Sequence, residues 1–228
     1  LGHTVTVAVN GREALEIGTR SGVPVHITHF YQRSPSPGTV GSPALPLCDA
    51  LLTNNEVFLA RTRGVGSITS QEAVAYGMSG PSLRATGLPY DIRAVEPYSA
   101  YEQFEFDIPV GSKGDSWDRY WVRLQEMYQS LRILEQALEQ MPEGPIMAQT
   151  RRISRPPAGE VFVHAENPRG DFGVYLVSDG GISPYRCKIR SPSLINLTVT
   201  EHLLIGWKLA DMIISLGSVD INMGEVDR

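Results

Sequence analysis

Three short polar segments hold the side chains that are best suited to chemistry in this sequence. They are residues 80–93 and 220–228, which combine cations with acids, and residues 185–193, which alternate cations with apolar residues. Opposed charges that are held rigidly at an interface can form a buried network that polarises or protonates a bound ligand. The same residues could instead form ion-paired surface loops, which contribute little to stability. The residue types alone leave both interpretations open.

The order of residues within these segments indicates which side chains would act together. The first segment places Arg84, Asp91 and Arg93 in a loop that glycine and proline residues keep rigid. In the second segment, alternation along a strand puts three cations on one face, namely Arg186, Lys188 and Arg190. The third segment ends the sequence with three acids and one arginine.

Metal-binding and nucleotide-binding patterns are absent from the sequence. It contains no P-loop, no GxSxG and no GxGxxG after a predicted strand. His26 and His29 have an HxxH spacing, but their β-branched neighbours argue against a helix and no nearby ligand completes the set. Cys48 and Cys187 lack a paired CxxC spacing and suit a reducing compartment. We therefore predict no metal site and assign no catalytic residue to this chain.

Composition argues against two further classes of protein. The formal net charge is −5 and no run of Lys or Arg is present, so nothing predicts a nucleic-acid interface. The longest apolar stretch, residues 203–219, is interrupted by Lys208 and Asp211. A membrane span needs about 20 mostly apolar residues, so we predict none. Any membrane association is expected to be peripheral, through partner subunits.

Three helices are predicted in the chain. Asp115 is a good N-cap for a long helix that ends before Pro142. Its apolar residues recur at spacings of three and four and are expected to pack in the core; they are Leu124, Met127, Leu131, Leu134 and Leu138. Ser70 is expected to cap a short helix over residues 71–76, and residues 203–216 are expected to form another helix.

Three strand signals follow the predicted long helix. Residues 160–164, 172–177 and 185–190 have the β-branched and aromatic content of strands that turns connect. These strands follow one another without intervening helices, so they predict a small antiparallel meander. The fold class is therefore α+β, a helical core with a small antiparallel sheet.

The first 48 residues differ from the rest and predict a domain boundary near Cys48. Residues 5–9 favour a strand and residues 12–17 a short helix, whereas a Pro-, Ser- and Gly-rich linker follows. Residues 2–16 resemble a strand and helix start of a response-regulator receiver domain. That likeness includes no phosphoacceptor aspartate and implies no phosphorelay role. We divide the chain into an atypical segment, 1–48, and a main domain, 49–228.

The main domain carries a more extensive resemblance. Residues 61–93 begin with RTRGVG and end with LRATGLPYDIR, and residues 97–145 continue through the predicted long helix. Residues 157–193 contain GEVFVHAENPRGDFGVYLVSDGG, and the chain ends in GEVDR. These motifs, in this order, resemble the C-terminal half of the 49-kDa subunit of respiratory complex I, also called its D subunit. The resemblance covers 180 residues, from 49 to 228.

The resemblance implies a fold similar to a truncated large subunit of [NiFe] hydrogenase, and a role in NADH–quinone oxidoreductase. The chain would help form a quinone-binding chamber, supporting electron transfer from NADH through iron–sulfur clusters to quinone, coupled to proton translocation. The residues expected at the chamber are Asp220, Asn222, Met223, Asp227, Arg228, Arg190 and Ser193. A supporting polar network would contain Arg84, Asp91 and Arg93.

The same resemblance implies that the chain binds no cofactor directly, with quinone as the substrate. FMN and the iron–sulfur clusters would lie on partner subunits, including the neighbour that carries the terminal cluster. The complex would bind the cytoplasmic face of the cell membrane, with this chain peripheral. A hydrogenase-like metalloenzyme would need four cysteine ligands, and two cysteines exclude it.

A second hypothesis is a truncated, non-catalytic interaction or scaffold fragment of the same family. It predicts no quinone binding and large exposed apolar patches. The quinone-site hypothesis predicts instead that residues 80–93, Arg190 and the last nine residues converge in space.

Overall fold

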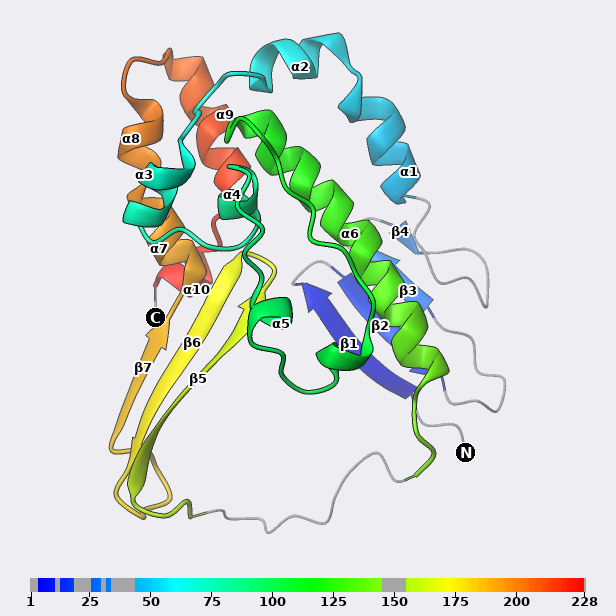
Figure 1. Ribbon diagram of the computed structural model, residues 1–228, viewed down its shortest axis with the longest axis vertical. Coiled ribbons are helices and arrows are strands. Elements are labelled where there is room, and N and C mark those ends of the chain that lie inside the picture. The colour runs from blue at the N-terminus through cyan, green and yellow to red at the C-terminus, as the bar shows by residue number, and fades with distance from the viewer. Residues whose placement is uncertain are drawn as a thin grey trace.

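The computed structural model describes residues 4–10, 13–18, 26–29, 32–33, 44–144 and 155–227, and Figure 1 shows their arrangement. Helices form one part of the molecule and two separate antiparallel sheets form the rest. One sheet has the order β1-β2-β3-β4 and the other the order β5-β6-β7. The predicted α+β class, with a small antiparallel meander, is confirmed.

The long helix α6, Ser116–Glu139, begins where its sequence predicts. The Asp115 carboxylate accepts a hydrogen bond from the Asp118 amide and so caps the first turn. The expected core stripe is right only at its start, because Leu124 is buried while the four later members are partly exposed. The buried part of α6 is its first third, around Arg119 and Val122.

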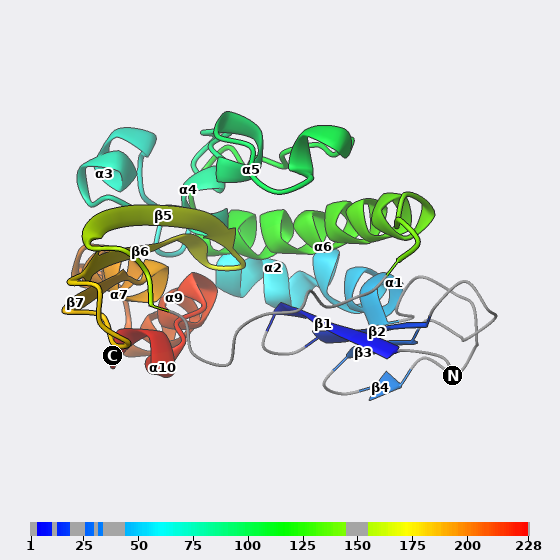
Figure 2. The same cartoon turned by 90° about the horizontal axis from the view of Figure 1, so that it is seen from below.

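Short helical segments lead from residue 44 to α6, and Figure 2 shows several of them on both sides of it. They are α1 (Ala44–Cys48), the π-helix η1 (Asp49–Thr53), α2 (Glu56–Thr62), α3 (Ser70–Ala75), α4 (Pro81–Arg84), α5 (Ile92–Val95) and the 3-10 turn η2 (Tyr101–Gln103). The helical segment α1–η1 runs through the boundary proposed near Cys48. The domain division therefore stays a prediction.

The cap of α3 differs by one residue from the sequence-based expectation. Thr69, not Ser70, is the N-cap: its hydroxyl accepts from the Glu72 amide, and the Glu72 carboxylate accepts from the Thr69 amide. This reciprocal pair is a capping box, which satisfies two otherwise unpaired amides. Ser70 is the first helical residue instead.

The three-stranded sheet consists of β5 (Gly159–Asn167), β6 (Gly170–Ser178) and β7 (Arg186–Arg190). Asn167 pairs with Gly170, so a tight turn joins β5 to β6. Alternation then places His164 opposite Gly173, and Gly173 opposite Arg190, in one row across the sheet. The predicted face of cations on β7 is therefore the same face that carries His164 on β5.

The predicted single helix over residues 203–216 is wrong. The chain forms α7 (Pro192–Thr198), α8 (Thr200–Leu204), α9 (Leu209–Val219) and α10 (Met223–Val226). Gly206, with φ of +83°, lies in the break between α8 and α9. Gly217 lies within α9 rather than after it. No helix in the described part of the chain is long and apolar enough to cross a bilayer.

The N-terminal sheet contains β1 (Thr4–Asn10), β2 (Glu13–Gly18), β3 (His26–His29) and β4 (Gln32–Arg33). The strand expected over residues 5–9 is confirmed, whereas the helix expected over residues 12–17 is wrong. Pairing with β1 and β3 gives β2 hydrogen-bonded neighbours on both edges, which overrides the weak helix propensity of a short segment. The predicted linker lies mostly outside the described residues.

The hydrophobic core joins helices that precede the three-stranded sheet in the sequence to helices that follow it. Its buried members come from the α3–α4 region and from the helices that follow the sheet: Ile68, Ala73, Met78, Leu83, Val199, Leu203 and Val219. Leu88, Tyr90 and Ile221 pack against it. This core therefore fixes the C-terminal segment relative to residues 80–93, although the two are far apart in the sequence.

Candidate functional site

The C-terminal segment folds back onto the start of α7. Asn222 caps α10 by accepting from the Gly224 amide at 3.1 Å, and its own amide lies 3.3 Å from Ser193 Oγ. The Ser193 hydroxyl donates to the Glu225 carboxylate at 2.5 Å. Ser193 is buried, and Pro192 at the first turn of α7 fixes the backbone there. Two predicted chamber residues, Ser193 and Asn222, therefore lie in contact.

Two arginines hold Asp220, the residue that ends α9. Arg169 Nε donates to the Asp220 main-chain oxygen at 2.8 Å, and Arg169 Nη2 lies 3.5 Å from its carboxylate. On the other side, Arg123 donates to the carbonyl oxygens of Ser218 and Val219 at 2.6 Å and 3.0 Å. Asp220 itself has a left-handed conformation with φ of +58°. The helix end and its acid are thus fixed by charge-assisted hydrogen bonds.

The predicted polar network of residues 80–93 forms around Arg84. This side chain is 1% exposed and lies 2.6 Å from Glu126, 2.9 Å from Glu166 and 3.7 Å from Asp91. Arg93 forms a second ion pair with Asp91 at 2.6 Å. Burial would lower the pKa of Arg84, but the neighbouring acids outweigh it and raise that pKa. The network is buried rather than a surface loop.

Glu166 is the carboxylate of this network whose pKa is raised. Burial raises its pKa, the charge of Arg84 opposes that rise, and the neighbouring carboxylate of Asp91 adds to it, so the net pKa is raised. Asp91 behaves oppositely: burial would raise its pKa, but hydrogen bonds and charge from Arg93 lower it. The pKa values of Glu166 and Asp91, which both pair with Arg84, are therefore shifted in opposite directions.

A third group of charges lies along one row of the three-stranded sheet. Arg190 Nη1 lies 3.0 Å from Asp171 Oδ2, and Asp171 Oδ1 lies 3.1 Å from His164 Nδ1. The other ring nitrogen of His164 is 3.1 Å from Glu96, just beyond α5. The sequence-predicted Arg190 therefore acts within a chain of alternating charge. It contacts none of the C-terminal acids in the described residues.

Buried Asn196 connects this row with the C-terminal group. Its side-chain amide donates to the carbonyl oxygen of Arg169 at 3.1 Å, and its side-chain oxygen accepts from the Ser79 amide at 3.3 Å. Ser79 Oγ in turn accepts from the Asp171 amide at 3.1 Å. A second link joins the C-terminal group to α4, because Arg123 Nη2 lies 3.3 Å from Ser82 Oγ.

The expected convergence is thus partial. Asp220, Asn222 and Ser193 form one cluster, and Arg84, Asp91 and Arg93 form another. Met223 is 67% exposed, and Asp227 is exposed as well. Arg228 lies outside the described residues. The described chain ends beside β7 (Figure 1).

Sequence reasoning missed several residues that organise these clusters. Among those left out of the predicted site are Arg123, Glu126, His164, Glu166, Arg169, Asp171 and Glu225. The only local signal was a turn motif with an arginine, residues 167–170, between two predicted strands. No group of three or more His, Cys, Asp and Glu side chains that could hold a metal ion occurs among the described residues.

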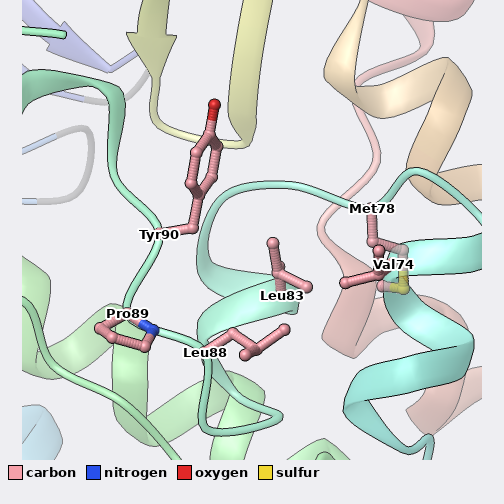
Figure 3. Close-up of a pocket in the computed structure, with 6 residues that line it drawn as sticks. All are labelled: Val74, Met78, Leu83, Leu88, Pro89 and Tyr90. Atoms are coloured by element: carbon pink, nitrogen blue, oxygen red, sulfur yellow. The ribbon is translucent and has the colours of Figure 1, made fainter. Parts of the chain in front are cut away.

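An apolar pocket of about 400 Å³ opens beside the core. Its lining comes from α3, α4 and the following loop: Val74, Met78, Leu83, Leu88, Pro89 and Tyr90. Figure 3 shows Tyr90 pointing its hydroxyl away from Leu88 and toward the strands of the three-stranded sheet. None of the predicted chamber residues lines this pocket, so it is separate from the C-terminal cluster.

Large apolar side chains are exposed on α9 and the loop that precedes it. Ile205 is 72%, Leu209 77% and Ile213 68% exposed, with Trp207 and Leu216 also exposed nearby. A surface of this kind is typical of an interface with another protein segment. The scaffold hypothesis predicts such a surface, but partner subunits, which the quinone-site hypothesis expects, would also cover it, so exposure alone does not separate the two hypotheses.

Comparison with known proteins places the chain in a family. The family model described as "Respiratory-chain NADH dehydrogenase, 49 Kd subunit" matches residues 41–228. The D subunit of NADH-quinone oxidoreductase from Desulforamulus reducens is 51% identical over 179 residues, which are 78% of this chain and 49% of that protein. The corresponding protein of Bacillus anthracis is 51% identical over 178 residues, 78% of this chain and 49% of its own length.

The protein of the same name from Carboxydothermus hydrogenoformans is 50% identical over 179 residues, covering 78% of this chain and 49% of its own length. The chain thus spans about half the length of the relatives it matches. The matched region contains every cluster described above. The chain belongs to the family of the 49-kDa subunit of respiratory-chain NADH dehydrogenase.

Proposed function

We propose that this chain forms one wall of a quinone-binding chamber in an NADH-quinone oxidoreductase. The observation that carries the proposal is the return of the C-terminal segment onto Ser193, within a chain of this family. Electrons from NADH would reach the quinone through iron–sulfur clusters, coupled to proton translocation. The chamber wall would consist of Asp220, Asn222, Met223, Asp227, Arg228, Arg190 and Ser193.

The chemistry of the substrate explains why paired acids and cations suit such a wall. A quinone that gains two electrons also takes up two protons, and each transfer is helped by a nearby acid. Asp220 is held by Arg169 and Arg123, so a change of charge on the quinone would alter a fixed electrostatic environment. Asp227 is exposed to solvent.

The proposal assigns the redox cofactors to other subunits. FMN and the iron–sulfur clusters would lie on partners, and the terminal cluster on the immediate neighbour. Exposed Ile205, Leu209 and Ile213 support contact with other protein segments. We propose a peripheral position on the cytoplasmic face of the membrane, and a fold shared with the large subunit of [NiFe] hydrogenase without its metal.

The test uses the complex assembled with its partner subunits. Asp220→Asn and Asp227→Asn are each expected to slow quinone reduction by about tenfold or more, because each removes an acid that assists proton transfer. NADH oxidation with a hexacyanoferrate acceptor should be unchanged. Asp179→Asn is a matched control, because Asp179 is exposed and directly follows the last residue of β6, Ser178. The β6–β7 turn lies at the end of the sheet away from α10 (Figure 1). If both variants assemble and reduce quinone at the full rate, the proposal that these acids line the chamber is wrong. Failure of the unmodified chain to support any quinone reduction would favour the scaffold hypothesis.

A further inference from the structure

His164 lies between two carboxylates that come from different elements. Its Nε2 is 3.1 Å from Glu96 Oε2, and its Nδ1 is 3.1 Å from Asp171 Oδ1. A neutral imidazole has one N–H donor and one lone pair, and a lone pair that faces a carboxylate is repelled. Only the imidazolium donates at both nitrogens. We propose that His164 is held as an imidazolium and, through Asp171, acts as a positioning residue for Arg190.

The register of the sheet makes this arrangement possible. His164, Gly173 and Arg190 occupy one row, and Gly173 contributes no side chain between the other two. A Cβ at Gly173 would lie 2.9 Å from the Phe162 ring and 3.4 Å from the Arg190 Cβ. The open position leaves room for Asp171, two residues earlier on the same face, to reach both cations. One carboxylate is therefore shared by an imidazole and a guanidinium.

The surroundings of His164 favour the protonated form. The hydrogen bond to Glu96 raises the pKa of His164, burial opposes that rise, and Asp171 adds to it. Other charges nearby are already engaged. Arg190 is paired with Asp171, and Glu166, on the same strand face, is paired with Arg84. Tyr90, before α5, is a further titratable group close to Asp171 and Glu96.

Loss of the His164 proton has a defined structural consequence. One carboxylate then faces a lone pair, so either Glu96 separates from the sheet or Asp171 turns away from the ring. If Asp171 turns, the ion pair that fixes Arg190 changes with it. The imidazolium thus ties the end of α5 to β5 and holds the row together. Any effect on a quinone chamber rests on the proposed function. The contact of the His164 imidazolium with Glu96 and Asp171, which we call the clamp, does not depend on it.

The protonation state is tested by NMR on the full chain with ¹⁵N-labelled histidine. At pH 7 both ring nitrogens of His164 are expected to be protonated, with a titration midpoint above the ordinary value of 6.5. Glu96→Gln should lower that midpoint; Glu96 is 63% exposed, so this variant should fold. A single neutral tautomer at pH 7, with a midpoint at or below 6.5 that Glu96→Gln does not move, would overturn the proposal.

The positioning role needs a second readout. Solvent exchange of the Arg190 guanidinium protons is expected to be several-fold faster in His164→Gln than in the unmodified chain at the same pH. His202→Gln is the matched control, because His202 lies near only one carboxylate among the described residues, Glu72 at 3.6 Å. Unchanged Arg190 exchange in folded His164→Gln would overturn the positioning role. Neither measurement uses quinone, so a failure of the proposed function is distinguishable from a failure of the clamp.

Discussion

Arg169 in the β5–β6 turn lies against Asp220 at the end of α9, with Arg169 Nε 2.8 Å from the Asp220 main-chain oxygen. Arg169 also approaches Glu225 in α10, at 3.8 Å. The Arg169 side chain therefore contacts both the residue that follows α9 and a residue within α10. The C-terminal segment is therefore held by the sheet turn as well as by Ser193 of α7.

Replacement of Arg169 is expected to release the C-terminal segment. Arg169→Ala removes one charge-assisted hydrogen bond, worth about 1.5–3 kcal/mol, together with the ion pairs to Asp220 and Glu225. Amide hydrogen exchange of residues 220–227 should increase strongly, with a smaller loss of global stability. Arg155→Ala, at an exposed position, is the control and should change neither. Unaltered protection of residues 220–227 in Arg169→Ala would show that other contacts hold the segment.

Loss of Arg84 is expected to be far more damaging than loss of a surface arginine. Arg84→Met leaves three acids without their shared cation in a buried site, and breaking a buried pair costs about 3–5 kcal/mol. Arg132→Met, on the exposed side of α6, should cost about 1 kcal/mol or less. Urea denaturation of the two variants measures both values. Equal costs would mean that the Arg84 cluster contributes no more than a surface pair.

The cap of α3 is tested by two neighbouring substitutions. Thr69→Ala removes the side chain that accepts from the third amide of the helix, and such a loss costs about 1 kcal/mol. Ser70→Ala changes the first helical position and should shift the free energy of unfolding by only a few tenths of that. A larger loss of thermal stability in Ser70→Ala than in Thr69→Ala would indicate that Ser70 is the cap.

The pH dependence of stability is expected to carry a contribution from Glu166. Its pKa is raised by burial, so the folded chain binds this proton more tightly than the unfolded chain does. The contribution is full below the unfolded pKa, near 4.5, and is lost as pH rises through the folded pKa. Glu166→Gln, which cannot ionise, should therefore gain in stability relative to the parent chain as pH rises across that window.

Chemical denaturation at a series of pH values from about 4 to 8 measures this difference. Glu201→Gln, at an exposed position on α8, is the control and should give a profile parallel to that of the parent. A parallel profile for Glu166→Gln as well would mean that Arg84 fully compensates the burial of this carboxylate.

Residue type and spacing alone determined the features that depend on neighbours within a few positions. Asp115 caps α6 through an amide three residues away, and alternation fixed the strands of the meander. The family resemblance was also readable, because the motifs follow one another along the chain. The expectation that Ser70 caps α3 is wrong, although Thr69 and Glu72, three residues apart, have the spacing of a capping box. Both residues can cap a helix, and the reciprocal Glu72 bond decided between them.

Only the tertiary structure decided which charges meet. Arg84 pairs with Glu126 from α6 and Glu166 from β5, and Arg169 reaches Asp220 across 51 positions of sequence. Such pairs depend on how the sheet and helices pack around Leu83, Val199 and Val219 rather than on residue spacing. The sequence therefore determined that cations and acids would occur in these segments. Packing determined that Arg190 belongs with Asp171 and His164, whereas Ser193, three residues later, belongs with the C-terminal segment.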